Sequence, residues 1–470
     1  MYKQLFGSDP PKCASLYSDA ELVRVAVIKK KLGDRKVVVN MTSIPPRFVH
    51  LQQVVNNLKT HLVIDKIVIH IPKKYTVKTF EYSDPPELNG AEVNLVDEDY
   101  GPCRRYIYGS GGQDINISLD DDTWYDHHIS IKLIEKYLNT GDCWTGSGFN
   151  FNKYFLGDFS KIPNESVQIM EGYGMILIPG DAIDKIREEF KELSHYNTSD
   201  DLILNNLLEK HGYKRNFYSE DGWIKQLDYG FNADALHKQN AEGSHLENYK
   251  KVLKDLKRTG KLFFKPIISY AICVCNEHVE LRNLLDTLVN NMIHSDEIRV
   301  LVDKNKVTNE VIKVLDDYNS FITEVHMREF NGDFSEHKNF LNSKCNGKYI
   351  FNLDADEVPS GSLIENVYRL TNSEAELVYV PRVNIVLGAS DRDMNYHNFT
   401  RNEVGFINWP DFQGRIYANA PHIKWESNLH ERIAGAKKVV NVSPEPNLAI
   451  WHVKSVEKCR QQKDYYDKLV

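Results

Sequence analysis

Short apolar runs alternate with amphipathic stretches along the chain, and their spacing predicts its elements. Residues 36–41 and 65–71 are rich in valine and isoleucine, as buried parallel strands are, and residues 48–61 between them repeat apolar side chains at helical spacing. A further strand is expected over residues 91–96. Strands that alternate with helices predict an α/β fold, which binds ligands at the carboxyl ends of its strands.

The same alternation returns in the second half of the chain. Residues 266–275 and 297–302 are apolar runs typical of parallel strands, and residues 281–289 between them have the pattern of an amphipathic helix. The sequence therefore predicts a second α/β unit.

One apolar strand in each half runs directly into a cluster of carboxylates. Residues 115–119 lead to Asp120–Asp122, and residues 351–353 lead to Asp354–Glu357. A carboxylate cluster at the end of a strand suits a hard divalent cation, Mn²⁺ or Mg²⁺, held against phosphate oxygens.

The two acidic clusters follow an earlier strand at the same distance. Val38 lies 82 positions before Asp120, and Ile272 lies 82 positions before Asp354. Solenoid repeats are shorter, roughly 20 to 50 residues. Two tandem copies of one domain architecture are therefore expected.

Chain length supports two domains, because single cores stop growing at about 250–300 residues and this chain has 470. We expect an amino-terminal domain over residues 1–240 and a carboxyl-terminal domain over residues 265–470. The Lys/Glu-rich run between them, residues 241–264, is expected to be a helical linker.

Composition narrows the function classes. The net charge of −8 argues against a general nucleic-acid binder. No run approaches the roughly 18 apolar residues of a membrane span, and residues 1–10 lack the apolar core of a signal peptide. We therefore expect a soluble cytoplasmic protein. The seven cysteines show no zinc-like spacing.

Arginines follow the strands of the first half where an anionic ligand would bind. Arg47 comes after the first strand, and Arg104 and Arg105 precede the acidic strand. A guanidinium there would fork onto a phosphate. A surface ion pair for Arg47 and a turn with solvated arginines for the other two are the alternatives.

Three further positions have both a functional and a structural interpretation. Asp200 and Asp201 precede an apolar helical run, where they would either cap the helix or act as a general base toward an acceptor hydroxyl. His237 is either a metal ligand or a surface residue, and Asp303 either binds a nucleoside or caps a helix.

Several motifs of the second half, in this order, carry a resemblance to a known family. Cys275-Asn-Glu277, Asp303 and Asn352-Leu-Asp-Ala-Asp-Glu357 are followed by Phe412-Gln-Gly-Arg-Ile416, Leu429-His-Glu431 and Ile450-Trp-His-Val-Lys454. This set resembles the family-two GT-A glycosyltransferases, in particular the branch that makes lipopolysaccharide-core-type linkages. The resemblance covers residue 266 to the carboxyl terminus.

The resemblance implies a role for each matching residue. Asp354 and Asp356 would hold the cation and the sugar diphosphate, with His452 near the metal. Glu277 and Asp303 would bind the nucleoside. The remaining expected residues are Arg415 on the donor and either His430 or Glu431 as the base.

The first half resembles the amino-terminal domain of multidomain glycosyltransferases from large algal DNA viruses. The matching motifs are Ser43–Arg47, Asp99–Pro102 and Asp120–Asp122. The group often has Thr-Lys shortly after the second motif, whereas this chain has Cys103-Arg104-Arg105.

The resemblance gives the first half a second set of expected site residues. Donor binding is expected from Ser43, Arg47, Arg104, Arg105, Asp120 and Asp121. Metal binding is expected from Asp120, Asp122 and His237, and Asp200 or Asp201 is the expected base.

Together these features predict two tandem GT-A domains in one bifunctional, metal-dependent glycosyltransferase. Its donors would be nucleotide-diphosphate sugars, UDP-linked and including a deoxyhexose such as rhamnose, and its acceptor a growing oligosaccharide or glycoprotein glycan. If the protein is viral, the site of action would be the host cytoplasm. No Gly-x-Ser-x-Gly nucleophile motif is present, which favours inversion by single displacement.

Two alternatives remain open. In the first, only the carboxyl-terminal domain is catalytic, and the amino-terminal domain binds glycan or acts as a scaffold. In the second, the protein is a nucleotidyltransferase, although no glycine-rich loop with an activating lysine is visible.

Overall fold

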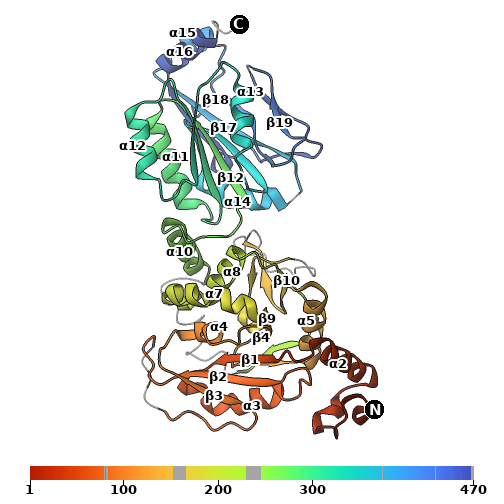
Figure 1. Ribbon diagram of the computed structural model, residues 1–470. Coiled ribbons are helices and arrows are strands. Elements are labelled where there is room, and N and C mark those ends of the chain that lie inside the picture. The colour runs from red at the N-terminus through yellow and green to blue at the C-terminus, as the bar shows by residue number, and fades with distance from the viewer. Residues whose placement is uncertain are drawn as a thin grey trace. The chain divides into compact units, whose positions relative to one another are not determined.

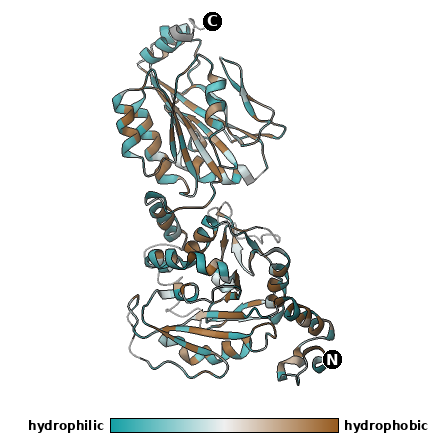
Figure 2. Ribbon diagram, viewed as in Figure 1, coloured by the Kyte–Doolittle hydropathy of each residue, from teal (hydrophilic) through white to brown (hydrophobic). Residues whose placement is uncertain are grey.

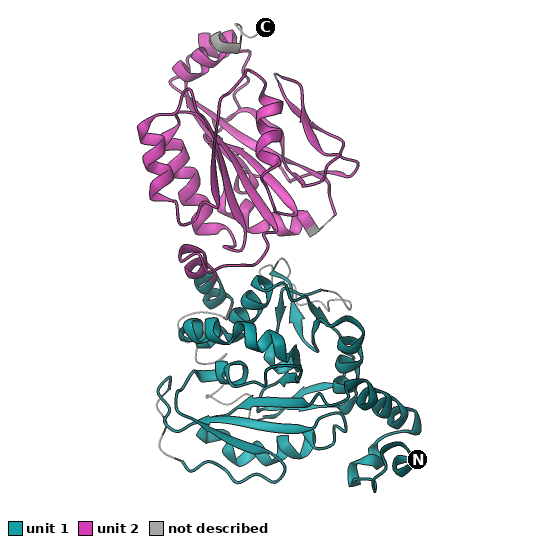
Figure 3. Ribbon diagram, viewed as in Figure 1, with its two compact units in different colours: residues 1–252 teal, residues 253–470 magenta. Residues whose placement is uncertain are grey.

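The computed structural model describes residues 1–78, 80, 83–151, 166–228, 245–372, 374–428 and 430–466. The chain divides into two compact units, Met1–Val252 and Leu253–Val470 (Figure 3). Helix α10 (His245–Arg258) crosses this division, within the stretch expected to link two domains. No helix in the described part of the chain is long and apolar enough to cross a membrane.

The first unit is built on a mixed seven-stranded sheet (Figure 1). Four neighbouring strands run parallel, and β9 joins them antiparallel beside β4. In spatial order the strands are β3 (Glu92–Val96), β2 (Lys66–Pro72), β1 (Val37–Thr42), β4 (Ile115–Ser118), β9 (Ile176–Pro179), β6 (Cys143–Thr145) and β10 (Arg215–Phe217).

Helices cover this sheet, and four short strands form two small two-stranded sheets. The helices are α1 (Tyr2–Phe6), α2 (Asp19–Leu32), α3 (Phe48–Leu58), α4 (Arg104–Ile107), α5 (His127–Thr140), α7 (Gly180–Leu193) and α8 (Asp200–Lys210). The short strands are β5 (Thr123–Tyr125), β7 (Gly148–Phe149), β8 (Ile169–Met170) and β11 (Ile224–Gln226).

The second unit has a nine-stranded sheet that repeats the core of the first. Its strands are β14 (Glu324–Arg328), β13 (Glu297–Asp303), β12 (Ile268–Val274), β15 (Tyr349–Asp354), β18 (Ile407–Ala418), β17 (Leu377–Leu387), β22 (Ile450–Ser455) and β16 (Glu357–Pro359), with β21 (Val439–Asn441) beside β17. A separate pair is formed by β19 (Lys424–Glu426) and β20 (Arg432–Ala434).

Helices flank the second sheet on both faces (Figure 1). Helix α11 packs against α12 and α14, whereas α13 packs against β12 and β13 from the side that carries β19. The helices are α11 (His278–Asn291), α12 (Asn309–Asp317), α13 (Phe334–Asn342), α14 (Gly361–Asn372), α15 (Asp391–Tyr396) and α16 (Val456–Tyr466).

Both sheets place their first four strands in the order third, second, first, fourth, all parallel, and add an antiparallel strand next to the fourth. Val38 pairs with Asn116 in the first unit, and Ile272 pairs with Leu353 in the second. These paired positions are 78 apart in the first unit and 81 apart in the second, so the equal spacing of 82 locates the same two strands in each unit but not equivalent residues along them. As a result, each acidic cluster lies at the carboxyl edge of its sheet.

The strands are the most hydrophobic elements (Figure 2), because both faces of each central strand are covered. In β1 the successive side chains of Val37, Val38 and Val39, which point to opposite faces, are at most 3% exposed, and in β12 those of Ala271 and Ile272 are fully buried. This explains why the strands appear in the sequence as continuous apolar runs rather than as alternating ones.

Asp296 ties three other elements to the start of β13. The residue is only 1% exposed. Its carboxylate accepts hydrogen bonds from the backbone N–H groups of Ile267 and Ile268, each at 2.9 Å, and from the hydroxyl of Tyr368 on α14. Its backbone carbonyl accepts a hydrogen bond from Lys257 on α10.

Burial raises the pKa of Asp296 to about 6, although its hydrogen bonds act in the opposite direction. An unfolded aspartate titrates near roughly 3.9. Between these values the folded chain keeps a proton that the unfolded chain has released, so the free energy of unfolding falls as pH rises. The Asp296→Asn variant has no such proton. As pH rises from about 4 to 7, its free energy of unfolding should therefore increase by roughly 2–3 kcal/mol relative to that of wild type.

Urea denaturation of both full-length proteins across this pH range measures the difference. A difference between variant and wild type that stays constant with pH would contradict the prediction.

Candidate active sites

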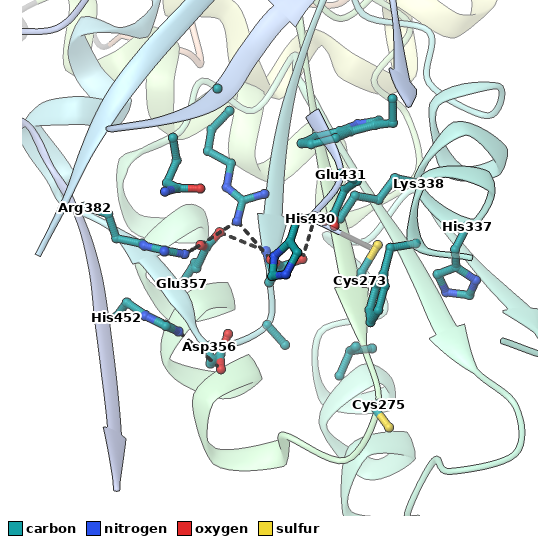
Figure 4. Close-up of a pocket in the computed structure, with 18 of the residues that line it drawn as sticks. Cys273, Cys275, His337, Lys338, Asp356, Glu357, Arg382, His430, Glu431 and His452 are labelled. Carbon is teal, nitrogen blue, oxygen red and sulfur yellow. Dashed lines mark hydrogen bonds and ion pairs between the residues drawn. The ribbon is translucent and has the colours of Figure 1, made fainter. Parts of the chain in front are cut away.

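A cavity of 640 Å³ lies at the carboxyl ends of β12, β13 and β15 in the second unit (Figure 4). Its lining residues come from nine strands of the unit, from helices α13 and α16 and from the loops between them. Every residue that the sequence singled out in this half lines it, namely Glu277, Asp303, Asp354, Asp356, Arg415, His430, Glu431 and His452.

Two arginines neutralise the carboxylates at the end of β15. Arg415 Nη2 lies 2.9 Å from Asp354 Oδ2 and 2.6 Å from Glu357 Oε1, and Arg382 Nη1 lies 2.7 Å from the same oxygen of Glu357. Burial alone would raise the pKa of Asp354, but the cations around it, Lys338 and Arg415, hold it well below its usual range. Asp354 is therefore ionised throughout the neutral range.

Lys338 on α13 connects two parts of the cavity. Its Nζ lies 3.3 Å from Asp354 Oδ1 and 2.9 Å from Glu431 Oε1, and its side chain is only 4% exposed. The ammonium also sits 4.6 Å from the ring centroid of Trp425. Burial would lower the pKa of Lys338, yet the neighbouring carboxylates raise it. The lysine stays charged and holds Glu431 at a fixed place.

Asp356 faces the other side of the cavity. Its Oδ2 lies 3.4 Å from Lys454 Nζ, 3.3 Å from Lys458 Nζ and 3.6 Å from His452 Nε2. Burial acts to raise the pKa of Asp356, but His452 and the two lysines hold it well below its usual range. This corner combines an ionised carboxylate with two ammonium groups.

The partners of His452 define the role of its ring nitrogens. Asn384 donates from Nδ2 to Asp411 at 2.8 Å, so its Oδ1 accepts from His452 Nδ1 at 2.7 Å. Burial lowers the pKa of His452, which favours the neutral ring. Nε2 lies 3.6 Å from Asp356 Oδ2, so a neutral His452 and this carboxylate would be able to share a cation.

The donor set at this corner therefore fits a divalent cation, with Asp356 and His452 as the protein ligands. In the described part of the chain, Asp354, Asp356 and His452 do not bring three ligand atoms within 4.8 Å of one another. Mg²⁺ and Mn²⁺ commonly take one or two protein ligands and complete their shell with phosphate oxygens and water. The set suits a cation that arrives with a diphosphate.

Glu277 and Asp303 lie at the ends of β12 and β13 and fix the loops that follow. Glu277 Oε2 accepts from the N–H groups of Cys275 and Asn276 at 2.9 and 3.0 Å, and Asp303 Oδ1 accepts from the N–H of Asn305 at 3.1 Å. Asp303 does not cap a helix, because Thr308 caps α12. The helix-cap alternative for Asp303 is wrong.

The first unit has a corresponding cavity of 760 Å³ at the carboxyl edge of its sheet. The described residues predicted for this half all line it, and His237 lies outside the described residues. The lining residues in question are Ser43, Arg47, Arg104, Arg105, Asp120, Asp121, Asp122, Asp200 and Asp201.

Arg47 is engaged inside this cavity rather than on the surface. Its Nη1 lies 2.6 Å from Asp121 Oδ1 and 3.0 Å from Asp122 Oδ2, and its side chain is 14% exposed. Ser43 donates to Asp121 Oδ2 at 2.5 Å. Burial, with the charges of Asp120 and Asp121, raises the pKa of Asp122 to about 6. The surface ion-pair alternative for Arg47 is wrong, because the pair is buried.

Arg105 gathers three carboxylates from two parts of the chain. It forms an ion pair with Asp120, and its Nη2 lies 2.7 Å from Asp200 Oδ2 and 3.3 Å from Asp201 Oδ1. Gly172 donates its N–H to Asp201 at 2.9 Å, and a Cβ at position 172 would lie 2.3 Å from Arg105 Nη2. A larger residue at position 172 would displace the guanidinium of Arg105, and glycine leaves it in place.

The arginines before the acidic strand are not solvated. Arg104 is 2% exposed and forms an ion pair with Asp99, and Arg105 is 5% exposed. The solvated-turn alternative is therefore wrong. Both residues lie in α4, line the cavity and form ion pairs with carboxylates.

Asp200 and Asp201 occupy the first turn of α8, but no side chain caps this helix at Ser199. Their carboxylates contact Arg105 instead, and Tyr106 donates to Asp201 at 3.1 Å. Capping is therefore not their role. Burial raises the pKa of both carboxyl groups, and that of Asp201 most strongly.

The sequence interpretation missed Lys338, Arg382 and Lys458. Lys338 could have been found, because it stands four residues after Phe334 and three before Leu341, on the apolar face of its helix. A lysine in that position needs a buried partner. Arg382 stands inside an apolar strand, which is a similar signal.

Residues 269–426 match the family model described as glycosyl transferase family 2. No curated protein sequence matches the chain. Among solved structures, S. aureus TarS 1–349 has 13% identity and a TM-score of 0.30, over 40% of this chain and 60% of that one. The same protein in complex with UDP-GlcNAc has 14% identity and a TM-score of 0.31, over 40% and 58%.

The mannosyltransferase PcManGT from Pyrobaculum calidifontis, in complex with GDP-Man and Mn²⁺, has 12% identity and a TM-score of 0.28, over 40% of this chain and 57% of that one. The chain thus spans less than two thirds of these structures. The family model covers the elements that deliver Glu277, Asp303 and Asp354 to the cavity of the second unit. Residues 269–426 of the carboxyl-terminal unit therefore form a glycosyl transferase family 2 domain.

Proposed function

We propose that the chain is a bifunctional glycosyltransferase whose two GT-A domains, residues 1–240 and 265–470, add sugars from nucleotide-diphosphate donors to a growing glycan. One observation carries the proposal: the same strand order brings a carboxylate cluster into a cavity in each unit. UDP-sugars, UDP-rhamnose among them, are the donors that the motif resemblance favours. The acceptor is an oligosaccharide or a protein-linked glycan.

The donor side of the second site is formed by the corner around Asp356. Asp356 and His452 would hold a divalent cation, Mn²⁺ or Mg²⁺, which when bound neutralises the negative charge that gathers on the leaving diphosphate. Lys454 and Lys458 add two positive charges within 3.4 Å of the same carboxylate. Glu277 and Asp303, at the ends of neighbouring strands, would orient the nucleoside.

The acceptor side is assigned to Glu431. Inversion by single displacement needs a base that removes the proton from the attacking hydroxyl. Glu431 faces the cavity with a carboxylate that Lys338 holds at 2.9 Å. His430 lines the same cavity, and Glu431 is preferred because its anchor is itself fixed by Asp354.

The first site would use the same division of roles. Asp120 and Asp122 would hold the cation, and Ser43, Arg47 and Arg104 shape the donor side. Asp201 is the preferred base, because burial raises its pKa and a base works best when its pKa lies nearer to neutral. Arg105 bonds to Asp120 and to Asp201, so it fixes both sides of the cavity.

Single substitutions test bifunctionality. With a panel of nucleotide sugars, we expect Asp356→Asn to reduce transfer from one donor by at least about 100-fold and Asp122→Asn to reduce transfer from another by a similar factor. Each variant should leave the other transfer within about threefold of wild type. A chelator should abolish both, and Mn²⁺ should restore both.

The matched controls are the exposed aspartates Asp34 and Asp316, changed to asparagine, one in each unit. If Asp122→Asn leaves every transfer unchanged while Asp356→Asn abolishes all of them, the first unit has no catalytic role. Calorimetry would then assign it a glycan-binding role if it binds glycan but no nucleotide sugar. Pyrophosphate release from a nucleoside triphosphate would instead indicate a nucleotidyltransferase.

A second substitution tests the base. Glu431→Gln keeps the shape of the side chain and removes its ability to accept a proton, so the rate of transfer should fall by about 10²–10⁴-fold. Binding of the donor, measured by calorimetry, should change by less than about threefold, because Glu431 contacts the acceptor. His430→Gln should retain transfer within about tenfold.

The exposed Glu426 on β19, changed to glutamine, is the control for a nearby carboxylate. Loss of transfer in the His430 variant together with full activity in the Glu431 variant would reverse the assignment.

A further inference from the structure

A cluster of metal-binding side chains lies outside both cavities, where α2 meets the start of α5. Glu21, His127 and His128 each offer one ligand atom, and these atoms lie within 4.8 Å of one another. In the described part of the chain this is the one group of three or more His, Cys, Asp or Glu side chains with that geometry. None of the three lines the cavity of the first unit.

The three ligand atoms, Glu21 Oε1, His127 Nε2 and His128 Nε2, face one another. Glu21 uses Oε2 for the capping box of α2, where it accepts from the N–H and hydroxyl of Ser18 at 2.6 Å. Its Oε1 turns to the histidines, 3.8 Å from His127 Nε2 and closer to His128 Nε2. Two ligands of a tetrahedral zinc ion lie roughly 3.3 Å apart.

The environment of His127 Nε2 is a second observation that points to a bound cation. Its side chain is 12% exposed, and Nε2 itself is buried without a hydrogen bond. A buried ring nitrogen normally has a partner. A cation between His127, His128 and Glu21 would supply one.

The second nitrogen of each ring faces one carboxylate. Asp126 Oδ1 lies against His128 Nδ1 and 3.8 Å from His127 Nδ1. Metal-binding histidines commonly pair their other nitrogen with a carboxylate, which fixes the ring and strengthens the ligand. The rings also stack on each other at 4.3 Å, and Trp223 stacks on His128 at 5.9 Å, so both imidazoles are held in orientation.

We propose that Glu21, His127 and His128 form a site for a divalent transition metal ion of the zinc class. Two imidazoles and one carboxylate select such an ion over Mg²⁺, which prefers oxygen ligands. The site would join α2 to α5. It would leave a fourth position for water.

The test is calorimetry with Zn²⁺ on the full-length protein, in excess Mg²⁺ that occupies the aspartate sites. Wild type should bind one Zn²⁺ that Mg²⁺ does not displace. Glu21→Gln and His127→Asn should each weaken this binding at least tenfold, and Asp126→Asn should weaken it about 10-fold or more through the rings.

These variants preserve the local fold. Glutamine serves in a capping box as glutamate does, and asparagine caps a helix as well as aspartate. His195→Gln, on another helix of the first unit, is the matched control and should bind Zn²⁺ as wild type does.

A second measurement is the absorption spectrum with Co²⁺, in which tetrahedral coordination gives intense visible bands that Glu21→Gln should abolish. Absence of Zn²⁺ binding in wild type, or binding that neither Glu21→Gln nor His127→Asn weakens, would show that the cluster is an ion pair only and would overturn the proposal.

Discussion

A carboxylate that leaves water loses several kcal/mol of solvation unless a cation or a set of hydrogen bonds replaces the water. Both cavities are built around carboxylates in that position. The strands that end in acidic clusters are buried on both faces, so the clusters are partly buried as well, and each is stabilised by a buried cation from another element. Arg415 and Lys338 form ion pairs with Asp354, and Arg105 forms one with Asp120.

The two units meet this constraint with different residues. In the second unit the cations beside Asp354 and Glu357 come from α13 and from the long antiparallel strands β17 and β18, and those beside Asp356 come from β22 and α16. No described strand of the first unit is as long as β17 or β18. In the first unit the cations come from α4 and from the turn before α3, which are local to the strands. A shared strand order therefore leaves the charge partners free to differ, and the two cavities need not accept the same donor.

The sequence was sufficient for what depends on local pattern. Apolar runs located the central strands, and the residues after them located the carboxylates, because a parallel sheet brings the ends of its strands together. It was insufficient where contacts join distant segments. Nothing local showed that Arg105 would reach Asp200, 95 positions away, or that Asp200 and Asp201 would leave their own helix uncapped. The cluster of Glu21 with His127 and His128 was missed for the same reason, because α2 and α5 meet only in the folded chain.

Lys338 is shared by the two halves of the second cavity, and a shared ammonium cannot neutralise two carboxylates fully at once. Positive charge that arrives beside Asp354 weakens the pull of Asp354 on the lysine and repels it, which leaves Glu431 with the larger share of its field. If donor and acceptor occupy the sides proposed for them, a charge bound on the donor side would therefore reach the acceptor side through one side chain. The proposed assignment of roles then implies an ordered sequence, in which the nucleotide sugar enters before the acceptor.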